Sequence, residues 1–156
     1  MDFTVYAMVS DADNGAVSYE FFGSKKVPVE NICRIEQVGS LAQVMKQGDT
    51  VWVVDVNRFG SVGVFWNFYQ MCKSKRVSLK FLATPYLNYQ PGKEWKSSYE
   101  KIVMYLLQVE KKMAGDICRS IKGVNPVFMQ NYAGYIAVNV LGQIFCIDGV
   151  MNRSSC

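Results

Sequence analysis

The segment from Val51 to Gln70 (VWVVDVNRFGSVGVFWNFYQ) constrains the fold of this chain more than any other part of its sequence. Five of its first six residues are apolar, and a short run of this kind predicts a buried strand. A polar turn with a glycine follows at residues 57–61, and an aromatic-rich segment with helical spacing comes next. A buried strand that leads directly into a helix is typical of a parallel sheet, because each crossover helix packs back on the sheet.

Strands and helices are predicted to alternate along the first half of the chain. Short apolar runs bounded by turn residues predict strands at residues 3–9, 32–38, 51–56 and 77–83. Helical spacing predicts a weak helix at 16–23, a short one at 41–47 with Ser40 as its N-cap, and a longer one at 62–74. The longer helix is expected to bury Val64, Phe65, Phe68, Met71 and Cys72. We therefore expect an α/β fold with a mainly parallel sheet of four to five strands flanked by helices.

The longest helical pattern runs from about residue 93 to residue 122, with apolar residues at spacings of three and four. A straight helix of this length would be about 45 Å long, which exceeds the width of a domain of this size. We therefore expect part of its apolar stripe to contact another chain in a homodimer or homotetramer. The alternative is that the tail, residues 123–156, covers the stripe; this tail has strand-like, buried character.

Composition limits both the architecture and the chemistry. A chain of 156 residues, half of them apolar, fits one domain, which we place at residues 1–122. Histidine is absent and the five cysteines are scattered without a CxxC pair, which argues against Ser-His-Asp and Cys-His nucleophiles, zinc sites and a disulfide framework. We expect no metal and no cofactor. The sequence has neither a membrane-spanning apolar run nor a basic amino-terminal region, so we expect a cytoplasmic protein without membrane contact.

The positive charge of the chain is concentrated in its middle third. The net charge is +4, and residues 73–122 hold eleven basic and four acidic side chains. A block of this kind is either a solvated helix face or a surface for a phosphate backbone. The charge alone does not decide between the two.

Four motifs resemble, in their order along the chain, the catalytic domain of serine site-specific recombinases, the resolvases and invertases. They are VYAMVS at residues 5–10, GDTVWVVDVNRFGS at 48–61, VSLKFLATP at 77–85 and LLQVEKKMAGDICR at 106–119. The resemblance covers about residues 3–122. It implies a resolvase-like fold with a long dimerisation helix, and strand cleavage and rejoining of DNA through a phosphoserine link.

The resemblance also implies roles for particular residues. Ser10 stands at the position of the nucleophile, and Arg58 matches an arginine that binds the DNA phosphate in the family. Planar guanidinium groups suit this task because they bond phosphate oxygens bidentately. Ser61, Lys111 and Arg119 lie at further positions expected to contact phosphate or DNA. The backbone amides at residues 60–63, at a helix start, would add a cradle for an anion.

The chain departs from the family pattern at several of these positions. Met8 and Asn57 replace an arginine and an aspartate, Ser61 replaces the second arginine of the turn, and Lys111 replaces an arginine. Loss of one electrostatic contact to a transition state commonly lowers the rate about a hundredfold. We therefore expect strand cleavage to be weak or absent, unless lysines at positions 25, 26 or 111 compensate.

Three functions remain open on this basis. The first is a DNA strand transferase with Ser10 as nucleophile and Arg58 as phosphate ligand. The second is an inactive resolvase-like module used for dimerisation or regulation. The third is a small-ligand protein that binds an anion near Ser10 and Arg58. Without the resemblance, Ser10 is a common turn residue and Arg58 a common partner for a carboxylate such as Asp55.

Overall fold

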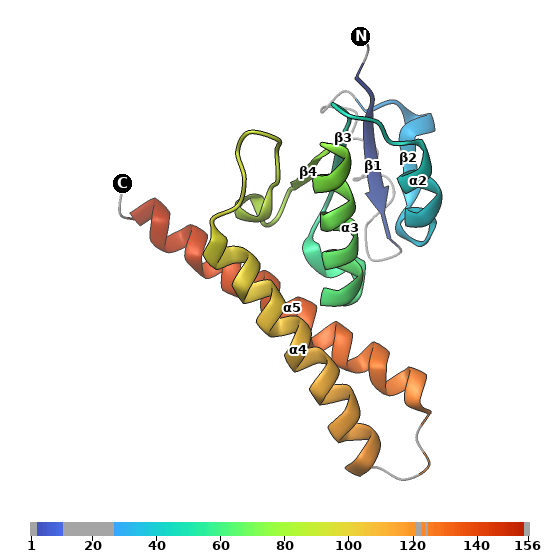
Figure 1. Cartoon of the computed structure of the whole chain (residues 1–156), viewed down its shortest axis with the longest axis vertical. Coiled ribbons are helices and arrows are strands. Elements are labelled where there is room, and N and C mark those ends of the chain that lie inside the picture. The colour runs from blue at the N-terminus through green and yellow to red at the C-terminus, as the bar shows by residue number, and fades with distance from the viewer. Residues whose placement is uncertain (1–2, 11–26, 121–122, 124, 155–156) are drawn as a thin grey trace.

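The computed structural model describes residues 3–10, 27–120, 123 and 125–154 of the chain. Four strands form a single parallel sheet in the order β2-β1-β3-β4 (Figure 1). They are β1 Val5–Val9, β2 Ile32–Arg34, β3 Thr50–Val53 and β4 Ser78–Phe81. The predicted α/β fold with a mainly parallel sheet is therefore confirmed. The weak helix predicted at residues 16–23 lies outside the described residues.

The register of the sheet brings three strands to an end at the same level. Met8 of β1 pairs with Val53 of β3, and Val53 pairs with Phe81 of β4. The residues that follow these strands therefore emerge together at the carboxyl edge of the sheet. Ser10 and Asp55 each lie two residues beyond a paired position, so the segments after β1 and β3 share this edge.

The chain between β2 and β3 differs from the prediction. The strand expected at 32–38 ends at Arg34, whose backbone N–H donates to the Gln37 side chain as the chain turns through η2 (Ile35–Gln37). Helix α2 then spans Val38–Val44, so Ser40 lies inside the helix and its prediction as an N-cap is wrong. The remaining 3-10 segments are η1 Val29–Asn31, η3 Val56–Phe59 and η4 Pro85–Leu87.

Helix α3, Val62–Lys75, packs on the sheet as predicted and supplies much of the core. Its buried residues recur at helical spacing: Val62, Phe65, Phe68, Tyr69 and Cys72. Val64, which was expected in the core, is 42% exposed, and the buried face is centred on Tyr69 instead. The Tyr69 ring stacks on Trp95 with 3.9 Å between ring centroids, which fixes the loop before the next helix against α3.

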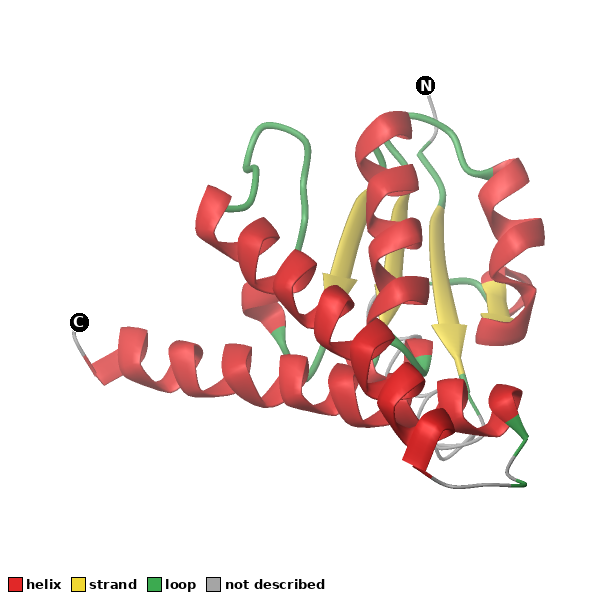
Figure 2. Cartoon of the chain, turned by 60° about the horizontal axis from the view of Figure 1, so that its bottom comes forward, coloured by secondary structure: helices red, strands yellow, loops and turns green. Residues whose placement is uncertain are grey.

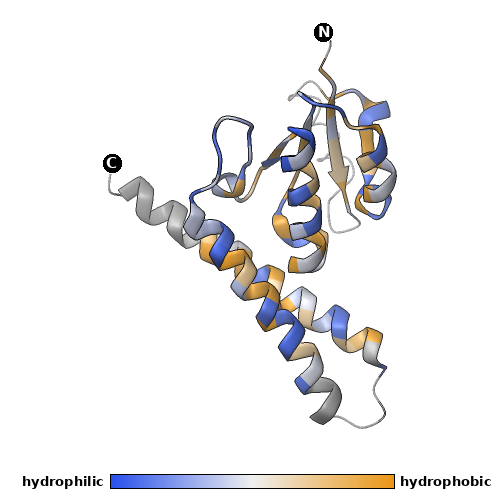
Figure 3. Ribbon diagram, viewed as in Figure 1, coloured by the Kyte–Doolittle hydropathy of each residue, from blue (hydrophilic) through white to orange (hydrophobic). Residues whose placement is uncertain are grey.

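Two long helices complete the fold. Helix α4 spans Ser97–Ser120, and its 24 residues correspond to about 36 Å. Helix α5 spans Pro126–Ser154, so the strand-like character predicted for the tail is wrong. Hydrophobic and hydrophilic residues alternate around α4, as its amphipathic pattern predicts (Figure 3). Among the helices in the described part of the chain, none is both long and apolar enough to span a membrane.

Helix α5 returns along α4 and crosses below the carboxyl ends of the strands (Figures 1 and 2). Among its described side chains, the buried hydrophobic ones recur at helical spacing: Met129, Ala133, Ala137, Val138, Leu141 and Phe145. The Phe145 ring contacts Tyr99 of α4, with 4.7 Å between the centroids. The tail therefore covers part of the apolar stripe of α4, which was the alternative to contact with another chain.

Candidate functional site at the carboxyl edge of the sheet

The turn between β3 and α3 forms the centre of this edge. Asp55 begins η3, and its side chain accepts a hydrogen bond from the backbone N–H of Asn57 at 3.5 Å. Gly60 ends η3 in the left-handed region, with φ of 78°, a conformation that favours glycine. Ser61 is the N-cap of α3, and its Oγ accepts from the N–H of Val64 at 3.0 Å. The turn thus presents the start of α3 toward α4 and α5.

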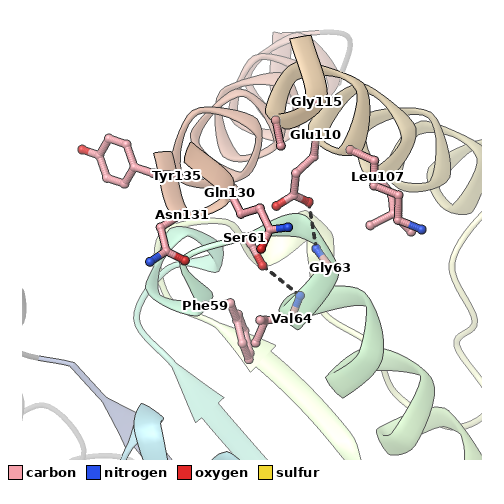
Figure 4. A pocket seen from close by; sticks show the side chains of 13 residues that line it. Phe59, Ser61, Gly63, Val64, Leu107, Glu110, Gly115, Gln130, Asn131 and Tyr135 are labelled. Carbon is pink, nitrogen blue, oxygen red and sulfur yellow. Dashed lines mark hydrogen bonds between the residues drawn. The ribbon is translucent and has the colours of Figure 1, made fainter. Parts of the chain in front are cut away.

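A glutamate from α4 occupies the start of α3. The backbone N–H of Gly63 donates to Oε2 of Glu110 at 3.1 Å (Figure 4). Glu110 is only 9% exposed, and this burial raises the pKa of its carboxyl group. Hydrogen bonds from the amides of Gly63 and Val62, and the charge of Lys111, lower that pKa to a smaller extent. The amide cradle expected to hold a phosphate therefore holds a carboxylate of the protein itself.

Helix α5 lies directly on this turn because residue 134 is a glycine. A Cβ atom at Gly134 would lie 2.7 Å from Cβ of Ser61 and 2.7 Å from Oε1 of Glu110. It would also lie 3.1 Å from the carbonyl oxygen of Gly60. Distances this short leave no room for any side chain, so the close contact of α5 with the turn depends on this glycine.

A chain of polar side chains joins η3 to α5. Nη1 of Arg58 donates to Oδ1 of Asn57 at 2.8 Å. Nδ2 of Asn57 donates in turn to Oδ1 of Asn139 at 3.2 Å, and Nδ2 of Asn139 donates to the carbonyl oxygen of Tyr135 at 2.7 Å. Asn57, which stands where the family has an aspartate, thus connects the turn that carries Arg58 to the helix above it.

An open cleft of about 850 Å³ lies between the start of α3, α4 and the first half of α5 (Figure 4). Ser61 and Lys111, two of the predicted site residues, both line it, together with Glu110 and the ring of Tyr135. Its volume lies in the range of ligand-binding pockets. Glu110 in its wall opposes an anion and Lys111 favours one, so the predicted phosphate contacts of Ser61 and Lys111 stay a prediction.

The other predicted site residues lie elsewhere. Ser10 directly follows β1 and is half-buried, and Arg58 lies in η3; neither of the two lines the cleft. Arg119 belongs to the last turn of α4, and its side chain lies outside the described residues. Among the described residues, no group of three or more His, Cys, Asp or Glu side chains is placed to hold a metal ion.

Sequence reasoning did not assign a role at this edge to Glu110, Gly134 or Asn139. Glu110 lies inside the motif at residues 106–119 but was given no role, and the other two belong to the tail that was expected to be strand-like. One signal in the sequence was usable: Gly134 and Gly142 lie eight residues apart, about 80° around a helix, so both can fall within one broad face of it. The structure brings both glycines against the β3–α3 turn.

The chain matches none of the protein-family models and none of the curated protein sequences with which it was compared. The resemblance to serine recombinases therefore stays a prediction, and the function is argued from the geometry of the site.

Proposed function

We propose that this chain is a resolvase-like module that does not cleave DNA and acts by associating with another protein chain, either a second copy or an active relative. The observation that carries the proposal is the position of α5 and Glu110 at the carboxyl edge of the sheet. In a strand transferase of this class, the scissile phosphate has to reach this edge. Here helix α5 and the buried carboxyl group of Glu110 occupy this edge.

Electrostatics at the edge support the same conclusion. Asp55 and Glu110 both lie close to α5: a Cβ atom at Gly134 would lie 2.7 Å from Oε1 of Glu110, and one at Gly142 would lie 3.7 Å from Oδ1 of Asp55. A phosphate brought to this turn would meet two carboxylates, and the Gly63 amide that would bind it already donates to Glu110. Repulsion between like charges in a partly desolvated site opposes phosphate binding.

The position of Met8 supports the proposal as well. An arginine is expected here in the family, two residues before the nucleophile. Met8 is fully buried in the main apolar core. A charged side chain at this position would be desolvated without a partner, so an arginine is incompatible with this core. The apolar core around Met8 therefore explains why no arginine stands at this position.

Association is supported by the outer face of α4. Met104 is 49% exposed and Tyr105 is 67% exposed, although both lie in the middle of a long amphipathic helix whose inner face packs against α5. Native mass spectrometry at micromolar concentration is expected to show a dimer that dissociates in Tyr105→Glu. Tyr135→Glu is the matched control, because Tyr135 is 61% exposed but lies on α5. A strict monomer counts against self-association.

The absence of cleavage is tested with supercoiled DNA that carries a random-sequence insert. The wild-type chain is expected to form no covalent adduct with this DNA. An adduct that forms with the wild type and disappears in Ser10→Ala would overturn the proposal, because only a nucleophilic serine accounts for that pattern.

A second candidate is a strand transferase that becomes active when α5 is displaced. It is favoured by the parallel pairing of β1 with β3, which brings the segments carrying Ser10 and Arg58 to one edge. The substitution Gly134→Leu would force α5 away from the turn. If this candidate holds, Gly134→Leu forms a Ser10-dependent adduct that the wild type does not form.

A further inference from the structure

The outward side of α4 carries a row of exposed side chains. The buried residues among its described side chains are Val103, Leu106 and Glu110, and the row lies on the other side of the helix. The members of this outer row follow one another at spacings of four and three residues, which keeps them on one face: Lys101, Tyr105, Gln108, Lys112 and Asp116. The last four line a shallow hollow of about 510 Å³, and every described residue in the wall of this hollow belongs to α4. The described part of the fold therefore leaves this face open to a partner.

The outer row carries opposite charges at its two ends. Lys101 lies near the start of α4 and Asp116 near its end. In a parallel pair of α4 helices, Lys101 would face Lys101 and Asp116 would face Asp116, so like charges would meet. In an antiparallel pair, Lys101 of each copy faces Asp116 of the other, because a two-fold interface forms every contact twice. Charge complementarity therefore favours an antiparallel second copy.

The position of these two charges along the helix supports the same pairing. The midpoint between Lys101 and Asp116 lies between residues 108 and 109, and the midpoint of α4 (Ser97–Ser120) is the same. Two copies that pair these charges therefore overlap along all 24 residues of the helix. A displacement of one helix along the other would reduce this overlap and would move Lys101 away from Asp116 of the other copy.

The middle of the outer row is self-complementary in the same register. Tyr105 and Lys112 also have their midpoint between residues 108 and 109, so each Tyr105 ring lies opposite Lys112 of the second copy. Tyr105 is 67% exposed, and an aromatic ring packs well against the apolar stem and the cationic end of a lysine. Gln108 and Val109 lie next to the two-fold axis and meet their own counterparts. The ring that is exposed in one copy is thereby covered in the pair.

A nucleic acid fits this face less well than a second copy. A phosphate backbone is negative along its whole length, so it would be attracted by Lys101 and Lys112 but repelled by Asp116. We propose that α4 pairs antiparallel with α4 of a second copy, with Lys101 of each copy opposite Asp116 of the other. This pairing rests on the proposed function, in which the chain acts by associating with another chain.

Charge reversal tests the pairing, with sedimentation velocity of the full chain at micromolar concentration as the measurement. The wild type is expected to dimerise. Lys101→Glu and Asp116→Lys each place like charges opposite one another at two symmetry-related positions, so each is expected to weaken the dimer roughly tenfold. The double variant Lys101→Glu/Asp116→Lys restores opposite charges and is expected to dimerise within about threefold of the wild type. Lys46→Glu, an equal change of charge at an exposed residue outside α4, is expected to have no effect.

A mixture of the two single variants tests the orientation of the helices. In a mixed dimer the introduced glutamate faces the introduced lysine, and the native Lys101 faces the native Asp116, so all four charges meet opposite charges. Native mass spectrometry, with one variant isotope-labelled, is therefore expected to show mixed dimers in excess over either homodimer.

The pairing is overturned if the wild type is a monomer, if the single variants dimerise as the wild type does, or if neither the double variant nor the mixture recovers dimerisation. In the last two cases the chains still associate, through another surface or orientation, so the proposed function stands. The proposed function fails on a different result, a DNA adduct that depends on Ser10.

Discussion

Two glutamates on α4, Glu100 and Glu110, lie ten residues apart, one partly exposed and the other buried. Glu100, near the start of the helix, is 33% exposed and accepts from Nζ of Lys73 at 2.9 Å and from the Tyr69 hydroxyl at 2.8 Å. Glu110 is buried and accepts from the backbone amide of Gly63, beneath Gly134 of α5. Glu100 thus forms an ion pair, whereas Glu110, in the same helix, caps the start of helix α3.

The pKa directions of the two carboxyl groups follow from this difference. Hydrogen bonds from Lys73 and Tyr69 lower the pKa of Glu100, because they stabilise its charged form. Burial raises the pKa of Glu110, because its desolvation outweighs the hydrogen bonds from Gly63 and Val62 and the charge of Lys111. Glu100 therefore belongs to an ordinary surface ion pair, whereas Glu110 is held in an unfavourable environment by the helices that meet at the carboxyl edge.

The largest effect on stability is expected from adding a side chain at Gly134, which lies close to Glu110. Gly134→Ala places a methyl group 2.7 Å from Ser61 Cβ and Glu110 Oε1, so α5 has to shift, and the free energy of unfolding should fall by about 1–3 kcal/mol. Gly39→Ala is the control, since no atom lies within 4 Å of a Cβ at that helical position. Urea denaturation measures both. Equal stability of the two variants would contradict the close packing of α5 on the turn.

The next prediction compares the stability lost when each of the two glutamates is replaced. Glu110→Ala leaves the part-buried Gly63 N–H without its partner, which is expected to lower the free energy of unfolding by about 1–3 kcal/mol. Glu100→Ala removes a partly exposed ion pair, which typically contributes less than about 1 kcal/mol. Urea denaturation at neutral pH gives the order of the two. A larger loss in Glu100→Ala would show that the capping bond contributes little.

The two glutamates should also give stability profiles of opposite sign against pH. The raised pKa of Glu110 means that the folded state binds its proton more tightly, so its contribution to stability falls as pH rises above the ordinary glutamate pKa of 4.5. The lowered pKa of Glu100 stabilises the folded state above 4.5, and this contribution is lost as pH falls below that value. Urea midpoints between about pH 3 and pH 7, compared for wild type, Glu110→Gln and Glu100→Gln, test both signs. Profiles that change in the same direction in the two variants would refute the assigned causes.

Much of the fold could be predicted because its signals are local. The apolar run at the third strand and the aromatic spacing of α3 are both contained in one short segment, and the structure forms them close to the predicted bounds. The tail was mispredicted for a physical reason. Helix α5 packs against α4 on one side and the β3–α3 turn on another, so it lacks the single apolar stripe by which a surface helix is identified.

The candidate site was less predictable because its contacts are long-range. Ser61 was assigned to a helix start, but the carboxylate that shares this start comes from Glu110, 47 residues after Gly63. The bond between Asn57 and Asn139 spans 82 residues. Such pairs depend on how α5 is placed over the sheet edge, and no local pattern in the sequence specifies that placement.

The smallest expected effect concerns salt. Lys73→Met removes the cation beside Glu100, where the two side chains are 39% and 33% exposed, and should lower the free energy of unfolding by less than about 1 kcal/mol. At about 1 M salt the Debye length falls to roughly 3 Å, so most of this difference should disappear. The loss caused by Glu110→Ala should largely persist under the same conditions, because Glu110 is only 9% exposed and its partner is an uncharged backbone amide. Chemical denaturation with urea at low and high salt compares the two variants; equal salt sensitivity would mean that Glu110 is as open to solvent ions as Glu100.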